Sequence, residues 1–246
     1  FAKSEIIGKG LICKLSDKPR VSNYSDIEPD NNKNLNPELE KLDFCHLHTF
    51  SQFSILQSTV RINELTQLAN ELEMPAVCIT DYNNLMGSFH FLKSLENINK
   101  KNKSENKKIL KPIIGITLNV CEDHLDRSRR DDGYQIVFIA KNKKGYKNLS
   151  KLSSLAYTKG FYYVPRVDKN IVLNFKDDLI VLTGNTYGEV SSKLLNIGEK
   201  QAEESLLWWN KHFKDDLYIE IMRHNLEDEN RINPVLLKFS VKHKIK

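Results

Sequence analysis

Short apolar runs of strand length alternate along this chain with longer segments whose apolar residues recur at helical spacing. The runs that predict strands span residues 44–47, 76–79, 112–116, 135–140, 179–182 and 217–221. The segments that predict helices span residues 62–72, 85–95, 146–157, 199–213 and 232–241. Strands that alternate with helices are typical of an α/β fold in which helices connect parallel strands. This periodicity leaves a barrel and a doubly wound layer as alternatives.

The two ends of the chain differ from this alternating region. Residues 1–41 are polar, contain three prolines and show little periodicity, which predicts a linker arm or the tail of an upstream domain. Within the arm, residues 5–15 are apolar enough to form a strand. Residues 42–246 predict one domain, which we expect to be incomplete at its C-terminal end because no strand follows the last amphipathic run. We expect the charged residues 97–108 to form a surface loop.

The composition argues against several classes of protein. The net charge of +5, from 37 basic and 32 acidic residues, permits a nucleic-acid partner without requiring one. The four cysteines form no CxxC pair, so we expect neither a zinc knuckle nor a disulfide framework, and a cytoplasmic location fits. No apolar run reaches the roughly 18 residues of a membrane helix and no signal peptide is evident, so we expect no membrane partner.

Several side chains that can bind metal ions follow predicted strands. His46 and His48 lie two residues apart, so a strand would point both to the same face. Asp81 ends the next strand, and Glu220 and His224 follow a late strand at helical spacing. Because the carboxyl ends of parallel strands meet at one edge, these groups can converge on a divalent cation that activates water for hydrolysis. The alternative is that local hydrogen bonds satisfy the two histidines.

Other polar and aromatic motifs have simpler interpretations. Asp123 and His124 are of metal-binding type, but their charged loop predicts that both are solvated. The basic residues 127–130 predict an exposed loop. Trp208 and Trp209 predict one core anchor and one surface or partner contact.

Seven segments, taken in order, resemble the PHP domain of the bacterial DNA polymerase III alpha subunit. They are FCHLHTFSQFSIL (44–56), PAVCITDYNNLMGSFHF (75–91), KPIIG (111–115), DGYQIVFIAKNKKGY (132–146), LAYTKGFYYVPRVD (155–168), IVLTGNTYGEV (180–190) and YIEIMRHNLEDE (218–229). The resemblance extends from about residue 42 to the end and implies a distorted (β/α)7 barrel of the PHP type. In its complete form, that barrel holds a cluster of divalent metals at the carboxyl ends of its strands, bound mostly by histidines.

The resemblance also implies that most metal ligands are missing. His48 matches a retained histidine ligand, and the last ligand pair would lie beyond Lys246. At the other ligand positions this chain has neutral or apolar side chains, namely Phe50, Gln57, Tyr82, Thr117, Gln135 and Asn185. One strong ligand cannot offset the lost hydration of two or three divalent ions, so we expect no metal, cofactor or catalytic residue in this segment. A buried Phe50 would instead contribute about 1.5–3 kcal/mol as packing.

The resemblance favours a non-catalytic scaffold within a replicative polymerase. The parent protein would catalyse template-directed DNA synthesis, with Mg²⁺ bound in its palm domain. Its partners would be the remaining polymerase domains, DNA, the proofreading exonuclease and other replicase subunits. The alternative is an active metal-dependent phosphoesterase or 3′–5′ exonuclease that uses His46, His48, Asp81, Glu220 and His224. A third alternative, an independent DNA-binding module, requires an affinity that falls steeply with salt.

Overall fold

The computed structural model describes residues 2–7, 10–15 and 44–246. β1 (Ala2–Ile7) and β2 (Gly10–Leu15) pair in antiparallel orientation, with Ile7 opposite Gly10. The single strand expected over residues 5–15 is therefore divided between two strands, because glycines interrupt the apolar run and glycine weakens a strand interior. The rest of the predicted arm, residues 16–41, lies outside the described residues, and the arm stays a prediction.

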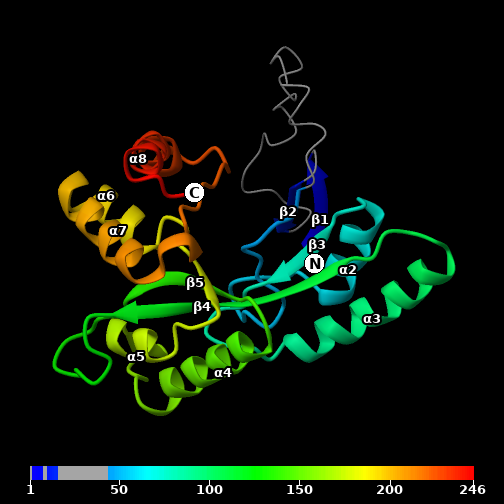
Figure 1. Cartoon of the computed structure of the whole chain (residues 1–246), viewed down its shortest axis with the longest axis horizontal. Coiled ribbons are helices and arrows are strands. Elements are labelled where there is room, and N and C mark those ends of the chain that lie inside the picture. Colours follow the sequence, from blue (N-terminus) through cyan, green and yellow to red (C-terminus); the bar gives the residue numbers. More distant parts are fainter. Residues whose placement is uncertain (1, 8–9, 16–43) are drawn as a thin grey trace.

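A six-stranded sheet forms the centre of the described region (Figure 1). The strand order is β3-β4-β5-β7-β8, and β6 pairs with β4 outside this path. β4 is parallel to β3 and β6, and β7 is parallel to β8. The strands are β3 (Ala76–Ile79), β4 (Lys111–Cys121), β5 (Tyr134–Ala140), β6 (Arg166–Asp168), β7 (Leu179–Leu182) and β8 (Leu217–Tyr218).

The orientation of β5 corrects the expectation of a parallel sheet. β5 is antiparallel to both β4 and β7. The chain passes from β4 to β5 through residues 122–133, which contain no helix. A parallel pair needs a crossover connection that usually contains a helix, whereas a direct loop returns the chain antiparallel to the first strand. The missing helix therefore explains the mixed sheet.

One predicted strand, residues 44–47, is absent from the structure, and another, residues 217–221, is shorter than predicted. Residues 44–47 form no strand, and the side chains of Phe44 and Leu47 are exposed at the surface rather than buried in the sheet. The residues that follow lie against the end of β3, where the Thr80 amide donates to the Thr49 carbonyl at 2.8 Å. β8 ends at Tyr218 rather than at residue 221, and the next amide, that of Ile219, donates to the Lys246 carbonyl at 2.7 Å.

Helices pack around the sheet in groups (Figure 1). α2 and α3 contact each other and β3 or β4, α4 and α5 lie beside β6, and α6 contacts both α7 and α8. Among the described residues, no helix combines the length and apolar content that crossing a bilayer requires. The helices are α2 (Ile62–Glu71), α3 (Ser88–Ser104), α4 (Lys143–Thr158), α5 (Lys169–Asn174), α6 (Glu189–Asn196), α7 (Glu199–Phe213), the short 3-10 helix η1 (Lys214–Asp216) and α8 (Glu227–His243).

α3 is longer than predicted, so the expectation of a loop over residues 97–108 is wrong for residues 97–104 and holds only for residues 105–108. The helix continues to Ser104 through a run of lysine and asparagine residues. Two of these asparagines anchor it to the segment before β4. The Asn99 side chain bonds both the amide and the carbonyl of Leu110, at 2.9 Å each, and the Asn102 amide group donates to the Lys108 carbonyl at 2.9 Å. This part of α3 has no apolar face to pack on the core. Side-chain hydrogen bonds to the segment before β4 hold it in place instead.

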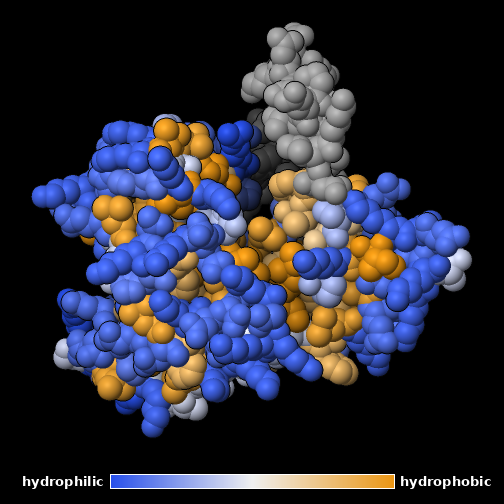
Figure 2. Space-filling model, viewed as in Figure 1, coloured by the Kyte–Doolittle hydropathy of each residue, from blue (hydrophilic) through white to orange (hydrophobic). Residues whose placement is uncertain are grey.

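The largest core lies between the sheet and helices α4 and α6–α8. Trp209 is the bulkiest fully buried side chain of this core, which confirms the predicted core anchor. Trp208 packs against the core from a partly buried position, and its predicted surface or partner contact stays a prediction. A second core joins α2 and α3 to β3, and a small third core lies among β3, β5 and β7. Figure 2 shows that hydrophobic residues also reach the surface, in patches among hydrophilic ones.

Candidate functional site

Four residues from separate parts of the chain are linked by hydrogen bonds just beyond the carboxyl ends of β3, β7 and β8. His48, which precedes β3, places its Nδ1 2.7 Å from Glu220 Oε1, and Glu220 follows β8. The other ring nitrogen of His48 lies 3.3 Å from the hydroxyl of Thr117 in β4. The Glu220 amide donates to the hydroxyl of Thr183, just after β7, at 3.0 Å. We call His48, Thr117, Thr183 and Glu220 the mouth network.

The mouth network shows that the sheet is curled. His48 and Glu220 lie beyond the opposite ends of the strand order, which begins at β3 and finishes at β8. Five flat strands would separate those ends by about 19 Å, since neighbouring strands are roughly 4.8 Å apart. A contact of 2.7 Å is possible only if the sheet bends round like the wall of a barrel.

Polar contacts on both sides hold the His48 ring in place. Thr117 donates its one hydroxyl proton to the Thr80 carbonyl at 3.0 Å, and its oxygen lies 3.3 Å from Nε2 of His48. On the other side of the ring, a Glu220 carboxylate oxygen lies 2.7 Å from Nδ1 and acts as the acceptor. Glu220 and Thr117 therefore fix the orientation of the His48 ring.

Asp81, just after the end of β3, is buried, and both of its carboxylate oxygens accept hydrogen bonds from the loop that follows His48. Its Oδ1 accepts from the Ser51 amide at 2.6 Å and from the Ser54 hydroxyl at 2.7 Å. Its Oδ2 accepts from the Ser51 hydroxyl at 2.7 Å. Such a set of donors holds a carboxylate in place and fixes the course of the loop.

Replacing Asp81 by asparagine is expected to destabilise the fold by about 1–3 kcal/mol, because the new amide group would face donors and leave at least one of them unpaired. Urea denaturation measures this loss. The control is Asp132→Asn, whose carboxylate pairs with Arg130 at the surface and is worth less than about 1 kcal/mol. Equal losses in the two variants would contradict a structural role for Asp81.

Aromatic and amide side chains fill the space beside the mouth network. The Phe50 ring meets the His48 ring edge-on at 5.2 Å and lies 6.4 Å from the Tyr82 ring. The Tyr82 hydroxyl contacts the Asn119 side chain at 2.8 and 3.0 Å, and Asn119 also donates to the Pro165 carbonyl. Sequence reasoning missed Asn119, although it lies two residues after Thr117 and a strand presents such residues on one face.

Comparison with known proteins identifies the family. Residues 45–224 match the model of the PHP domain. The chain belongs to the PHP domain family. Its relatives include DNA polymerase III subunit alpha of Borreliella burgdorferi, 33% identical over 201 residues, which are 80% of this chain and 17% of that protein. The subunit of the same name from Aquifex aeolicus is 36% identical over 214 residues, 83% of this chain and 18% of that protein. This PHP domain therefore spans about a sixth of the length of these relatives.

The other predicted positions of this PHP domain do not join the mouth network. Gln57 is exposed, and His46 packs edge-on against the Phe44 ring at 4.9 Å. Asn185 uses its side-chain oxygen to accept from the Tyr187 amide, and Gln135 donates its own backbone amide to the Tyr187 carbonyl. Because residues 44–50 are not a strand, the expectation that His46 and His48 share a strand face is wrong.

His224 is also separate from the PHP domain's mouth network. It was expected at helical spacing from Glu220, but α8 begins only at Glu227, so the two residues are not on one helix. The His224 ring instead pairs with Glu229 at 2.6 Å and remains largely exposed. His224 therefore belongs to the start of α8, where Glu229 also accepts from the His224 backbone amide.

The cysteines whose side chains are described are free thiols. Burial raises the pKa of Cys45, against the opposing charge of Lys111, and burial raises the pKa of Cys78 well above its ordinary value. Burial likewise raises the pKa of Cys121 to about 12. Thiols in this state stay protonated at neutral pH and are poor metal ligands.

The residues at the mouth do not fit the cluster of divalent metals that the PHP fold implies. Phe50 offers no donor atom, and Asp81 spends both oxygens on the Ser51–Ser54 loop. His48 and Glu220 are bonded to each other. One buried oxygen, Glu220 Oε2, has no hydrogen-bond partner among the described residues. Even if the hydrogen bond between His48 and Glu220 opened, these two residues would be too few for a metal cluster, because even one zinc ion takes about four ligands.

Proposed function

We propose that this PHP domain is a non-catalytic scaffold at the N-terminal end of a bacterial DNA polymerase III alpha subunit. The names of its relatives, and the small share of their length that it covers, support this assignment. The whole protein would then be a DNA-directed DNA polymerase of the cytoplasm. It would bind DNA and catalyse nucleotidyl transfer with Mg²⁺ in a separate palm domain.

The observation that carries the scaffold role is the hydrogen bond between His48 and Glu220. These are the two groups at the mouth best able to bind a cation, and they are hydrogen-bonded to each other. A cluster of two or three divalent ions needs several anionic or imidazole ligands to offset its lost hydration. A hydrogen-bonded imidazole and carboxylate instead tie the ends of the sheet together, which is a structural task.

Exposed apolar residues in the loop after His48 and around the start of α3 support a docking role toward the other polymerase domains. The side chains of Ile55, Met86 and Phe89 are largely exposed, and Leu56 is 99% exposed. Leu56 also has a φ of 65°, in the left-handed region that costs a residue with a Cβ roughly 1–2 kcal/mol. Groups of exposed apolar side chains commonly mark protein interaction sites. The proposed partners are the remaining polymerase domains, the proofreading exonuclease and other replicase subunits.

Elemental analysis and a hydrolysis assay on the 246-residue chain test the scaffold role. We expect no phosphodiester hydrolysis that a chelator abolishes. We also expect the double variant His48→Ala and Glu220→Gln to leave the amount of bound metal unchanged. Two or more metal equivalents that disappear in the double variant, together with chelator-sensitive hydrolysis, would instead establish an active phosphoesterase.

Nucleotide incorporation by the full-length polypeptide tests the polymerase assignment. We expect template-directed DNA synthesis that the single substitution Glu220→Gln leaves unchanged, because the reaction would take place in another domain. A full-length polypeptide without polymerase activity would contradict the assignment. Activity that Glu220→Gln abolishes while the melting temperature stays constant would contradict the non-catalytic role.

A further inference from the structure

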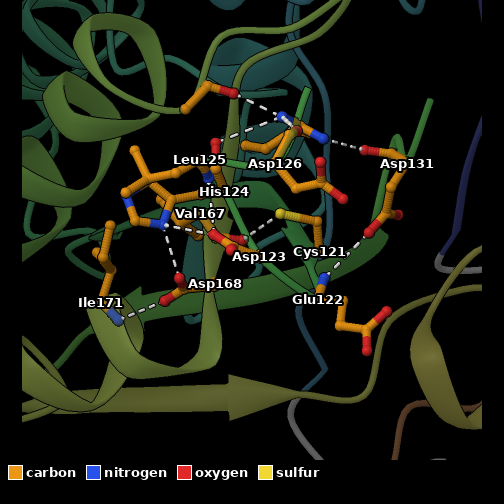
Figure 3. A network of polar contacts seen from close by, with 12 residues as sticks. Cys121, Glu122, Asp123, His124, Leu125, Asp126, Asp131, Val167, Asp168 and Ile171 are labelled. Carbon is orange, nitrogen blue, oxygen red and sulfur yellow. Dashed lines mark hydrogen bonds and ion pairs between the residues drawn. The ribbon is translucent and has the colours of Figure 1, made fainter. Parts of the chain in front are cut away.

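A second group of ligand-type side chains lies at the ends of β4 and β6, outside the mouth network. These strands pair in parallel with Cys121 opposite Asp168, so the loop after β4 starts beside the end of β6. Figure 3 shows the Asp123, His124 and Asp168 side chains turned toward one another. The His124 Nδ1 lies 2.6 Å from Asp168 Oδ2 and 4.0 Å from Asp123 Oδ1. One donor atom from each residue lies within 4.8 Å of the other two.

The burial of these side chains differs from the solvated pair that the sequence predicted. The exposed fraction is 59% for the Asp123 side chain, 13% for His124 and 8% for Asp168. Solvation therefore holds for Asp123 only. The charged loop gave no sign of this, because the partner, Asp168, is 44 residues further along the chain.

We propose that Asp123, His124 and Asp168 bind one divalent transition-metal ion of the Zn²⁺ class. The three residues offer one imidazole nitrogen and two carboxylate oxygens, a mixed donor set that suits Zn²⁺. Two carboxylates also match the charge of one divalent ion. Three protein ligands leave a fourth position for water, on the side where Asp123 meets solvent.

The distances from His124 to the two carboxylates are close to those around a bound ion. Ligand atoms about 2.0–2.1 Å from a tetrahedral zinc lie roughly 3.3 Å from one another. The His124–Asp168 distance of 2.6 Å would have to open and the His124–Asp123 distance of 4.0 Å would have to close, each by less than 1 Å. Side-chain rotation can supply such movements without changing the strands.

The local framework leaves the carboxylates available to the ion. Arg166, which is fully buried beside this loop, directs its guanidinium group to four backbone carbonyls, those of His124, Asp126, Asp131 and Gly160. It therefore fixes the course of the loop through the main chain. Asp168 Oδ1 accepts a hydrogen bond from the Ile171 amide and so caps α5. Its other oxygen, Oδ2, faces the proposed metal site.

Binding needs one proton movement on a neutral His124. In the metal-free protein, Nδ1–H donates to Asp168 Oδ2. With the ion on Nδ1, that proton is carried by Nε2 instead, so the ring changes tautomer and the number of protons is unchanged. The hydrogen bond to Asp168 is replaced by two bonds to the same ion, and the fold does not depend on the ion being present.

Calorimetric titration of the 246-residue chain with Zn²⁺ tests the site, with Co²⁺ absorption as a second readout. We expect one equivalent of Zn²⁺ to bind and Co²⁺ to show the visible spectrum of a tetrahedral site. His124→Ala and Asp168→Asn are expected to weaken Zn²⁺ binding by more than the roughly 10–100-fold that loss of an outer-shell partner costs. Asp168→Asn keeps a side-chain oxygen for the α5 cap, so it preserves the fold.

Two control variants separate this site from other histidines. His224→Ala removes an imidazole that also contacts a carboxylate at 2.6 Å, but not as part of a three-ligand group among the described residues. His48→Ala removes the histidine of the mouth network. Both controls should bind Zn²⁺ as the unmodified chain does. The proposal is overturned if the chain binds no Zn²⁺, if His124→Ala binds it normally, or if either control loses it equally.

Discussion

Replacing Glu189 by alanine is expected to lower the free energy of unfolding by about 3 kcal/mol, the lower end of the range for breaking a buried ion pair. Glu189 begins α6 and is 4% exposed. Its Oε1 accepts from Lys169 and Lys193 at 2.8 Å each, and its Oε2 accepts from the Trp209 indole at 2.8 Å. The variant leaves two ammonium groups and a buried indole N–H without this partner, although both lysines retain some access to water.

Urea denaturation of Glu189→Ala measures this loss, and Glu199→Ala is the matched control. Glu199 also begins a helix and also pairs with a lysine, Lys238, but both side chains of that pair are about half exposed or more. Exposed pairs contribute roughly 0–1 kcal/mol. If the two variants lose the same free energy of unfolding, the buried cluster around Glu189 stabilises the fold no more than an exposed ion pair does.

The contribution of Glu189 also has a defined pH dependence. Burial pushes its pKa upward, but the charge and hydrogen bonds of Lys169 and Lys193 outweigh burial and hold the pKa below the ordinary 4.5. A carboxylate whose pKa is lowered on folding stabilises the fold above the unfolded pKa, and this contribution is lost as pH falls through the folded pKa. The difference between the unmodified chain and Glu189→Ala should therefore be constant near neutrality and shrink below pH 4.5.

Arg166→Met is the second substitution for which we expect a large effect. Arg166 is completely buried and donates to four carbonyls, three of them in the loop of residues 122–133. Hydrogen bonds to a charged group contribute about 1.5–3 kcal/mol each. Because the loop carbonyls that lose Arg166 can bond to water instead, we expect the free energy of unfolding to fall by about 3 kcal/mol in total. The loop should also become more mobile, because its main anchor is gone.

Limited trypsin digestion reads out the loop directly. Arg127, Arg129 and Arg130 are cleavage sites within it, and Arg166→Met should be cut there faster than the unmodified chain. Lys141→Met is the control, since it removes a partly exposed surface pair with Asp216 and leaves the three cleavage sites intact. Unchanged cleavage at the loop in Arg166→Met would show that other contacts hold it.

The elements that sequence reasoning located best are those with a compact apolar signal. The bounds of β3, β7 and α7 agree with the predicted 76–79, 179–182 and 199–213. β3 and β7 are apolar runs of four residues placed between polar segments, and α7 carries its buried residues at helical spacing. In these elements the local pattern and the tertiary packing require the same side chains to be buried.

Sequence reasoning failed where tertiary contacts decide the structure. The end of α3 depends on side-chain bonds from Asn99 and Asn102 to a segment that follows it. The reversal at β5 could have been predicted, since no helical pattern separates the runs 112–116 and 135–140. At the site, residue types indicated that His48, Asp81 and Glu220 were of interest, but their pairings depend on strand register and barrel curvature. The roles assigned to the site residues stay predictions.

The distance along the chain between His48 and Glu220 has a consequence for biosynthesis. The two residues are separated by 172 positions. At about 5–20 residues per second, a ribosome needs roughly 10–30 s to add the second after the first. During that interval the hydrogen bond between His48 and Glu220 cannot form, because its second partner has not yet been synthesised. The contact that joins the two ends of the sheet therefore becomes possible only late in translation.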